Sequence, residues 1–436
     1  MSDTQRSQWS SQLAFVMSAI GSAVGLGNIW RFPYMMGKNG GAIFLVVYLL
    51  LIFTVCSVPL ICEMAFGKFT QKGSVKAFET VNPKFKIFGW IHVVTVIMIA
   101  AFYFVVGGWI LKYLWMSVSS TNVSDYSSYF SAFTSQSLVP CLLTAGFLSA
   151  CSVFTYRGIN KGVELANNIM MPLFAVFLVA LAFVSLQLPG AEAGLTFMFK
   201  PDFSKFSGTM VLQALGQALF TLSIGMGALI AYGSYLDKKA DIVKSAYCII
   251  CADTLFAVLA GVMIFPAVFT FGVEPTSGAG LVFITLPKIF AKMAYGNFFA
   301  FIFFILLLFA ALTSGISMLE VSVKAFMENF ELSRHKSTVL TFLIILTFAL
   351  PVTLSFGVLN NLKVCQMTLF DLFDFVSSNL FLPLNTLIIC LVVGWLLNFK
   401  KDYIFKNRFL YKLFMCATKY IVPTLLLILL VFGLIK

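Results

Sequence analysis

Residues 18–33 read Ser18-Ala-Ile-Gly-Ser-Ala-Val-Gly-Leu-Gly-Asn-Ile-Trp-Arg-Phe-Pro33, and they interrupt an apolar segment that extends from about residue 11 to residue 37. Glycines, an asparagine, an arginine and a proline therefore lie at the depth of a membrane-spanning helix. Irregular backbone persists in hydrocarbon only where it is buried in protein or lines a cavity, because unpaired backbone groups there are costly. The stretch predicts a broken first membrane helix beside a binding site.

The rest of the chain is apolar enough to be embedded in lipid. Of its 436 residues, 60% are hydrophobic and only 11% are charged, which is outside the range of soluble domains. A membrane span needs about 20 mostly apolar residues. That window predicts an all-α polytopic protein, a single membrane domain over residues 1–436, with eleven spans near 11–37, 42–69, 88–117, 137–155, 163–188, 209–233, 242–272, 295–327, 338–356, 368–398 and 409–435.

Lys and Arg in the short loops indicate the orientation, since cytoplasmic loops retain them. An N-terminus inside the cell puts most of these residues on the cytoplasmic side, among them Lys84, Arg157 and Lys238. We therefore expect a multi-pass protein of the cell (inner) membrane with its N-terminus in the cytoplasm and its C-terminus outside. This topology explains the net charge of +12, and no soluble basic face indicates a nucleic-acid partner. The lipid bilayer is the expected surrounding, with no obligate protein partner.

A related interruption occurs in the sixth span, where residues 221–227 read Thr221-Leu-Ser-Ile-Gly-Met-Gly227. Close helix packing through small residues would explain an isolated glycine pair. These two breaks, however, are five spans apart, and a unit of five spans is upside down when it occurs a second time. Such breaks indicate a midplane site between inverted halves. The halves are expected at about 11–188 and 209–398, with helix 11 at about 409–435.

Polar residues inside other spans suggest what the breaks could bind. Freed amides of a half-helix can hold an anion and freed carbonyls a cation. Ala310, Thr313 and Ser314 share one face of the eighth span, where their oxygens suit Na⁺, although hydroxyls in membrane helices more often bond to their own backbone. Asp253 is alone in the seventh span, where it would be protonated or paired with a cation such as sodium.

Further charged residues lie at the ends of spans or near the breaks. An Arg or Asp at a helix centre costs roughly 2.5 to 3.5 kcal/mol on insertion scales, so each needs a reason. Arg31 and Asp374 are interpreted as an outer gate, and a static ion pair is the alternative. Glu63 and Glu320 are expected to anchor broken-helix amides or waters, or to make structural hydrogen bonds.

The order of these motifs resembles the neurotransmitter:sodium symporter family, specifically its bacterial eleven-span amino-acid transporters. The matching stretches are residues 21–33, 39–41, 216–223 and 311–314, supported by 161–164, 199–202 and Tyr235. The resemblance implies a five-plus-five inverted repeat with broken helices 1 and 6, plus one extra helix. It also implies sodium-coupled symport of an amino acid by alternating access, with two sodium ions and no organic cofactor.

The resemblance further implies two sodium sites. One would use the carbonyls of Gly21, Val24 and Ala310 with the hydroxyls of Thr313 and Ser314. The other would use Ala23, Asn28, Thr221 and Asp253, with the substrate carboxylate as a further ligand. Most relatives have Asn where this chain has Asp253. Because this carboxylate can supply the charge that chloride supplies in chloride-dependent relatives, we expect chloride-independent transport.

A substrate pocket is implied in the same way, and it would be lined by Ala23, Leu26, Gly27, Ile99, Tyr103, Phe220, Thr221, Ser223, Met226, Ser314 and Met318. Backbone groups and the Tyr103 hydroxyl would hold the ammonium and carboxylate groups. The apolar Ile99, Met226 and Met318 would contact the side chain, which favours a bulky hydrophobic or aromatic L-amino acid. Arg6, Trp9 and Tyr235 match the cytoplasmic gate, whose acidic partner aligns near Glu328–Asn329.

Other functions remain open on the same sequence. A non-transporting amino-acid sensor could use the same site, and an ion channel is a third possibility. A membrane enzyme is a poorer interpretation, because His92 and His335 are the only histidines and neither lies near a nucleophile or a metal-binding group of residues.

Overall fold

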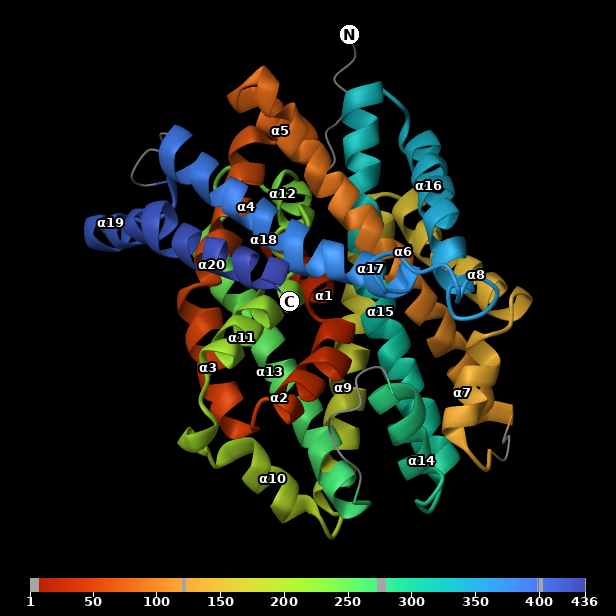
Figure 1. Ribbon diagram of the computed structural model, residues 1–436. Helices are drawn as coiled ribbons and strands as arrows, with labels where there is room; N and C mark the ends of the chain where they lie inside the picture. Colours follow the sequence, from red (N-terminus) through yellow and green to blue (C-terminus); the bar gives the residue numbers. More distant parts are fainter. Residues whose placement is uncertain (1–7, 120–122, 273–279, 398, 400–402, 436) are drawn as a thin grey trace.

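The computed structural model describes residues 8–119, 123–272, 280–397, 399 and 403–435, and every regular element in this part of the chain is a helix (Figure 1). Nine helical segments there are long and apolar enough to cross a membrane, and the bent pair Gln12–Ala23 and Gly27–Lys38 makes a tenth. The predicted all-α membrane architecture is confirmed. The sixth predicted span consists of two shorter helices, so the count of eleven stays a prediction, as does the division into two repeats.

The first five predicted spans correspond to α1 (Gln12–Ala23), η1 (Gly27–Arg31) and α2 (Phe32–Lys38); α3 (Ala42–Thr54) and α4 (Ser57–Thr70); η2 (Pro83–Phe85) and α6 (Lys86–Ser119); α8 (Leu138–Tyr156); and η3 (Ile159–Glu164) and α9 (Leu165–Leu186). The next five correspond to α11 (Gly208–Thr221) and α12 (Ala228–Gly233); α13 (Ile242–Thr270); α15 (Gly296–Phe330); α16 (Arg334–Leu354); and α17 (Leu369–Phe375), η6 (Val376–Phe381), α18 (Leu382–Leu391) and η7 (Val392–Leu396). The last comprises α19 (Arg408–Cys416), η9 (Ala417–Ile421) and α20 (Val422–Ile435).

Short helices in the connections were not predicted from the sequence: α5 (Ser74–Val81), α7 (Tyr126–Thr134), α10 (Ala191–Phe199), η4 (Phe203–Lys205), η5 (Leu281–Thr285) and α14 (Leu286–Phe290). Local capping explains α7, since the Asp125 carboxylate accepts hydrogen bonds from the amides of Ser127 and Ser128, each at 3.1 Å. Hydrogen bonds from the Ser128 side chain and these amides lower the pKa of Asp125. Helix α5 lies at one end of the bundle and α7, α10 and α14 at the other (Figure 1), and we name these the α5 end and the α10 end.

The break in the first span lies between Ala23 and Gly27. Val24 leaves the helical conformation with a ψ of 107°, and the two helical pieces are bent by 48°. In the sixth span the interruption covers residues 222–227, where Ser223 and Gly225 have φ angles of 54° and 83°. A β-carbon on Gly225 would lie 2.5 Å from the Leu382 carbonyl oxygen, so only glycine fits there. Both predicted breaks are confirmed.

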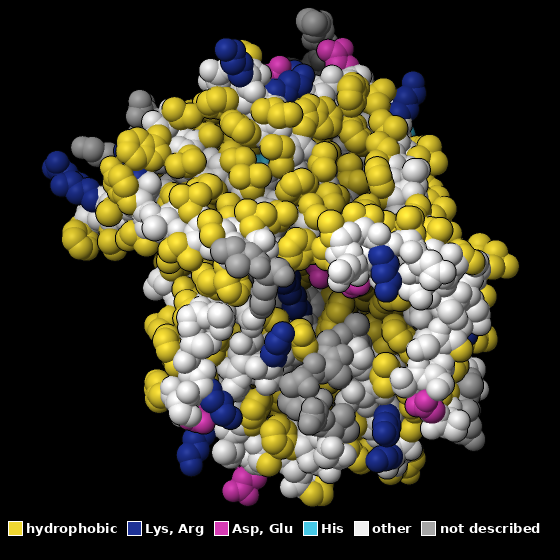
Figure 2. All heavy atoms as spheres, in the orientation of Figure 1, with side chains coloured by type: hydrophobic (Ala, Val, Ile, Leu, Met, Phe, Trp, Pro, Cys, Tyr) yellow, Lys and Arg dark blue, Asp and Glu magenta, His cyan; other side chains and the backbone are white. Residues whose placement is uncertain are grey.

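The breaks lie at the centre of the bundle, against the most buried helices. In the most apolar stretch of the segment Pro83–Ser119, 83% of the residues are buried. In the most apolar stretch of the segment Ile159–Leu186, only 33% are buried. Helix α6 therefore forms the core together with α15, and α9 has a large face left for lipid. In Figure 2 hydrophobic side chains cover most of this face towards the α5 end, and charged ones lie towards the two ends and around a hollow below α17.

Candidate functional site

Hydroxyl groups of α15 meet backbone carbonyls at the first break, and we name this group the α1–α15 site. The Ser314 hydroxyl lies 3.4, 3.2 and 3.4 Å from the carbonyl oxygens of Gly21, Ser22 and Val24. The Thr313 hydroxyl lies 3.1 Å from the Ala310 carbonyl oxygen. Thr313 and Ser314 are both buried. All the residues predicted for one sodium site are thus brought together, with Ser22 in addition, as a set of uncharged oxygens that suits a hard cation.

Asn167 of α9 packs directly on this site, which sequence reasoning missed. Its side-chain amide donates to the Val163 carbonyl at 2.7 Å, while its Oδ1 is buried without a hydrogen-bond partner. A β-carbon placed on Gly21 would lie 1.8 Å from this oxygen. The only available signal was an Asn within an apolar span, and such a signal does not say which helix it faces.

Replacing Gly21 with alanine is therefore expected to lower the stability of the protein by about 1–3 kcal/mol, the usual cost of overpacking a core. The added methyl group would collide with Asn167. In a protein that already carries Asn167→Ala, adding Gly21→Ala should lower the stability much less than it does in wild type. Thermal unfolding of the four purified proteins in a double-mutant cycle measures the difference. If Gly21→Ala destabilised wild type and the Asn167→Ala variant equally, the packing of Asn167 on Gly21 would be contradicted.

A second group, the Asp253 site, joins the first break to α13. The Asp253 carboxylate accepts hydrogen bonds from the Asn28 amide at 2.8 Å, the Thr221 hydroxyl at 3.1 Å and the Tyr48 hydroxyl at 3.4 Å. Its side chain is fully buried, and no Lys, Arg or His in the described residues forms an ion pair with it. A buried carboxylate without a fixed counter-charge is compensated by a mobile cation or a proton.

Three of the four residues predicted for the second sodium site, Asn28, Thr221 and Asp253, are therefore in contact. The fourth, Ala23, is the last residue of α1 before the break. Tyr48 was not predicted. It is the only aromatic hydroxyl in α3, but a lone tyrosine in an apolar span does not reveal its partner.

The freed backbone groups of the sixth span are satisfied by side chains from other helices. The Gly225 amide donates to Glu63 at 2.6 Å, and its carbonyl accepts from Asn385 at 2.8 Å. Gln217 donates to the Gly27 carbonyl at 3.1 Å, which ties α11 to η1. The proposed role of Glu63 as an anchor of broken-helix amides agrees with this contact. Pairing of this kind stabilises irregular backbone at membrane depth.

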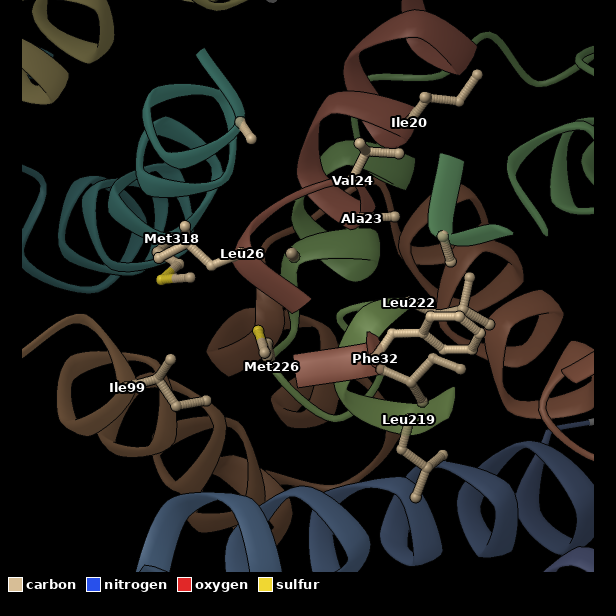
Figure 3. Packing of buried hydrophobic residues seen from close by; sticks show 14 of the residues in the cluster. Ile20, Ala23, Val24, Leu26, Phe32, Ile99, Leu219, Leu222, Met226 and Met318 are labelled. Carbon is tan, nitrogen blue, oxygen red and sulfur yellow. The ribbon is translucent and has the colours of Figure 1, made fainter. Parts of the chain in front are cut away.

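The apolar residues predicted to contact a substrate side chain lie together. Figure 3 shows Ile99, Met226, Met318 and Leu26 converging on one region from α6, the second break, α15 and the first break, and all four are at most 4% exposed. The Tyr103 hydroxyl and the Ser314 hydroxyl lie 3.3 and 2.5 Å from the position that a β-carbon on Gly25 would take, so both reach the broken segment. Ser223, also predicted here, donates to the Ser22 carbonyl at 3.0 Å.

A cavity of about 340 Å³, here the gate cavity, lies beside this region. Four predicted substrate residues line it, namely Leu26, Gly27, Tyr103 and Phe220, whereas Ile99, Ser223, Met226, Ser314 and Met318 do not. The region around Ile99, Met226 and Met318 is thus filled by its own side chains, and the gate cavity lies next to it.

Arg31 and Asp374 line the gate cavity but do not form an ion pair within 4.0 Å among the described residues. The Arg31 guanidinium instead lies 4.3 Å from the centroid of the Phe220 ring, and Asp374 accepts a hydrogen bond from Ser378 at 2.8 Å. The two charged residues predicted as an outer gate therefore both line the gate cavity without forming an ion pair with each other. Their role as a gate stays a prediction.

The α5 end is tightly closed. Trp9 donates its indole N–H to the Tyr232 carbonyl at 3.0 Å and packs edge-on against Tyr235. The Tyr235 hydroxyl donates to Glu320 at 2.7 Å, and Glu320 also forms an ion pair with Arg334. Of the predicted cytoplasmic gate, Trp9 and Tyr235 therefore lie together, while Arg6 lies outside the described residues.

The acidic partner expected near Glu328–Asn329 has other contacts. Glu328 accepts from the Gly73 amide at 2.8 Å and lies 3.5 Å from the Lys324 ammonium, while the Asn329 amide donates to the carbonyl of Ala325. Glu320, which had been expected to anchor amides or waters or to make structural hydrogen bonds, makes structural contacts with Tyr235 and Arg334.

Comparison with known proteins gives a consistent result. Residues 6–128 and 133–436 match the model of the sodium:neurotransmitter symporter family. An uncharacterized sodium-dependent transporter of Bacillus subtilis is 36% identical over 90% of this chain and 88% of its own length. An uncharacterized sodium-dependent transporter of Haemophilus influenzae is 33% identical over 99% of this chain and 98% of its own length.

More distant relatives and a solved structure extend this similarity. The human sodium- and chloride-dependent taurine transporter is 27% identical over 90% of this chain and 72% of its own length. The crystal structure of MhsT in complex with L-phenylalanine is 40% identical and covers 98% of this chain and 100% of that chain, with a TM-score of 0.91.

Proposed function

Because the chain belongs to the sodium:neurotransmitter symporter family, we propose that it is a symporter that imports a bulky hydrophobic or aromatic L-amino acid together with sodium. Family membership makes it a multi-pass, sodium-dependent membrane transporter and not an enzyme. What we propose beyond family membership is the identity of the substrate, its coupling to two sodium ions and the direction of transport. The observation that carries the proposal is the pair of buried oxygen groups at the first break, one neutral and one containing Asp253.

Sodium at both groups would use the residues already in place. At the α1–α15 site it would be held by the Gly21, Val24 and Ala310 carbonyls with the Thr313 and Ser314 hydroxyls. At the Asp253 site it would be held by the carboxylate, the Thr221 hydroxyl, the Ala23 carbonyl and the Asn28 amide oxygen, which in this structure accepts a hydrogen bond from the Gly25 amide at 2.9 Å. A carboxylate of the substrate beside the second ion would couple the two, since each would raise the affinity for the other.

The substrate class follows from the chemistry of the predicted pocket. Ala23, Leu26, Gly27, Phe220 and Thr221 offer backbone groups at the two breaks to the ammonium and carboxylate. The side chain would meet Ile99, Met226 and Met318, whose apolar surfaces include two adaptable thioethers. A charged side chain would find no partner there. The MhsT structure contains L-phenylalanine, which has a side chain of this kind.

Transport is proposed to be independent of chloride. The human relative is named for its dependence on sodium and chloride. In this chain the fully buried Asp253 carboxylate supplies a fixed negative charge beside the proposed ion. A chloride ion at the same place would add repulsion in a medium of low dielectric constant.

For alternating access we propose that the α5 end is cytoplasmic and the α10 end external. The structure, closed around Trp9 and open at the gate cavity, would then face outward. Binding would bring Arg31 and Asp374 together above the substrate, and release would follow when the contacts of Trp9 and Tyr235 separate. The inward sodium gradient would drive the cycle, with about 2.3 kcal/mol per charge for each 100 mV of membrane potential.

Uptake by purified protein in liposomes tests this proposal. With an imposed inward sodium gradient, labelled phenylalanine, tryptophan, leucine or isoleucine should accumulate, whereas glutamate and lysine should not. Accumulation should disappear when potassium replaces sodium and should persist when gluconate replaces chloride. Saturable sodium-dependent binding without accumulation would indicate the amino-acid sensor instead, and a non-saturable flux would indicate a channel.

A further inference from the structure

An apolar groove of about 430 Å³ lies on the outside of the bundle, between the start of α6 and the end of the tenth predicted span. Its walls include Phe85 and Phe88 on one side and Leu391, Trp395 and Leu396 on the other. The last three are 41%, 54% and 50% exposed, so the groove is open to the surroundings of the bundle. It shares no residue with the gate cavity, the proposed sodium sites or the predicted substrate pocket. We name it the α6–α18 groove.

The groove lies at the α5 end of the molecule. Trp395 is the residue before the last of η7, and the chain that follows contacts α4. The Phe69 ring near the end of α4 packs edge-on against Phe399 and Tyr403, with ring centroids 5.2 and 5.9 Å apart. Helix α5 follows directly after α4, so these contacts place the end of η7 at the α5 end. With the orientation proposed above, the groove faces the cytoplasmic leaflet of the membrane.

A lysine from the last span lies beside the groove. The Lys419 ammonium is 5.0 Å from the centroid of the Trp395 ring, and the Tyr420 ring packs edge-on against Trp395 at 5.6 Å. In the described part of the chain, Lys419 forms no ion pair with an Asp or Glu. Its backbone lies eleven residues after Arg408, the first residue of α19, whereas its ammonium reaches Trp395 at the end of a span. A lysine extended in this way brings its charge to the level of the lipid headgroups.

The chain between η7 and the last span is strongly basic. Residues 397–420 contain Lys400, Lys401, Lys406, Arg408, Lys412 and Lys419, with Asp402 as the only acidic residue. A cluster of Lys and Arg directly beside the cytoplasmic end of a span is typical of segments that bind anionic lipids. Trp and Tyr side chains such as Trp395 and Tyr420 are enriched at this same level of the membrane. The charge of this region therefore favours an anionic headgroup.

A phospholipid combines the two chemistries that this surface offers. We propose that the α6–α18 groove binds an acyl chain of an anionic phospholipid whose phosphate is held by Lys419. Trp395 joins the two parts of the site, because its ring lines the groove and also lies beneath the ammonium. A soluble anion would leave the apolar groove unfilled, and a lipid without net charge would leave Lys419 without a counter-charge. The leaflet rests on the proposed orientation, whereas the binding itself does not.

The groove borders a contact that supports the second break. The Asn385 amide of α18 donates to the Thr95 hydroxyl of α6 at 2.9 Å and to the Gly225 carbonyl at 2.8 Å. Thr95 lies two turns after Phe88, and Asn385 lies one turn before Ile388, both of which line the groove. A bound acyl chain fills the space beside this contact and favours the present spacing of α6 and α18. Binding should therefore also raise the midpoint of thermal unfolding.

Native mass spectrometry of the purified protein tests the proposal, with dioleoylphosphatidylglycerol and dioleoylphosphatidylcholine as probes. The two lipids have the same acyl chains and differ in net charge. Wild type should bind a single phosphatidylglycerol about tenfold more tightly than phosphatidylcholine, the usual effect of one charged hydrogen bond. Lys419→Gln should remove this preference, and Lys419→Arg should keep it. The matched control Lys244→Gln changes an exposed lysine at the start of α13, also at the α5 end, and should bind as wild type does.

A second variant tests the groove itself. Leu391→Trp fills the groove from its exposed edge and should weaken binding of both lipids about tenfold, equivalent to roughly two methylene groups kept from burial. An unchanged midpoint of thermal unfolding in lipid-free detergent shows that each variant is folded. Equal affinity of wild type for the two lipids, or an unchanged preference in Lys419→Gln, would overturn the proposal. So would a dimer that Leu391→Trp dissociates, since a second copy of the chain would then occupy the groove.

Discussion

Replacing Asp253 with asparagine is expected to reduce sodium-driven uptake in chloride-free medium by roughly a hundredfold or more. Removing one partner of a buried charge pair costs about 3–5 kcal/mol, because the remaining charge is left uncompensated. Here the remaining charge would be the sodium ion. Asparagine has nearly the same shape, and its side-chain oxygen can still accept from Tyr48 and Thr221, so the effect would arise from charge rather than packing.

The measurement is initial uptake into liposomes in chloride and in gluconate medium. Chloride should restore part of the activity of Asp253→Asn, since a free anion can take the place of the lost carboxylate. The matched control Asp202→Asn changes an exposed aspartate that caps η4 and should leave uptake intact. Uptake by Asp253→Asn that is unchanged and indifferent to chloride would refute the role given to this carboxylate.

The second large effect is expected at the α1–α15 site. Thr313→Val combined with Ser314→Ala removes both hydroxyls while keeping the volume of the side chains nearly constant. Each hydrogen-bonding group lost from a charged partner is worth about 1.5–3 kcal/mol, so the sodium concentration for half-maximal uptake should rise on the order of a hundredfold or more. Each single variant should show a smaller rise in the same direction.

A matched control is available on α16. The Thr347 hydroxyl is exposed and bonds to the carbonyl of Leu343 in its own helix, so Thr347→Val should leave the sodium dependence unchanged. Uptake is followed as a function of sodium at constant ionic strength. A double variant that loses maximal rate but keeps the sodium affinity of wild type would show that these hydroxyls do not bind the ion.

Local geometry predicts only parts of the candidate site, and the full sets of sodium and substrate residues came from the resemblance to the family. Thr313 and Ser314 lie on one face of a continuous helix, and the glycine-rich breaks reveal themselves by their position in apolar sequence. The partners Tyr48, Asn167 and Asn385 could not be predicted. A single polar residue in a span indicates that it needs a partner, but helix rotation and neighbour are decided by packing across the whole bundle.

The cavities and the separation of Arg31 from Asp374 were equally beyond the sequence. The same two residues would be present in an open and a closed gate, and alternative conformations of a protein differ by only a few kcal/mol. The short helices α5, α7, α10 and α14 were missed for another reason. They are helices of five to nine residues in connections, below the length at which an apolar window detects a span.

The tie between the two broken helices has a mechanical consequence. Gln217 joins α11 to the Gly27 carbonyl, and Arg31 of η1 lies over Phe220 of α11. These two contacts oppose sliding of η1 and α2 along α11, so a rotation of either helix should move the other with it. We therefore expect bending to occur at the non-helical stretches 24–26 and 222–227, while α2 and α11 move together as one unit. A distance measured between spin labels on α2 and α11 should therefore stay constant while the distance from either to α15 changes.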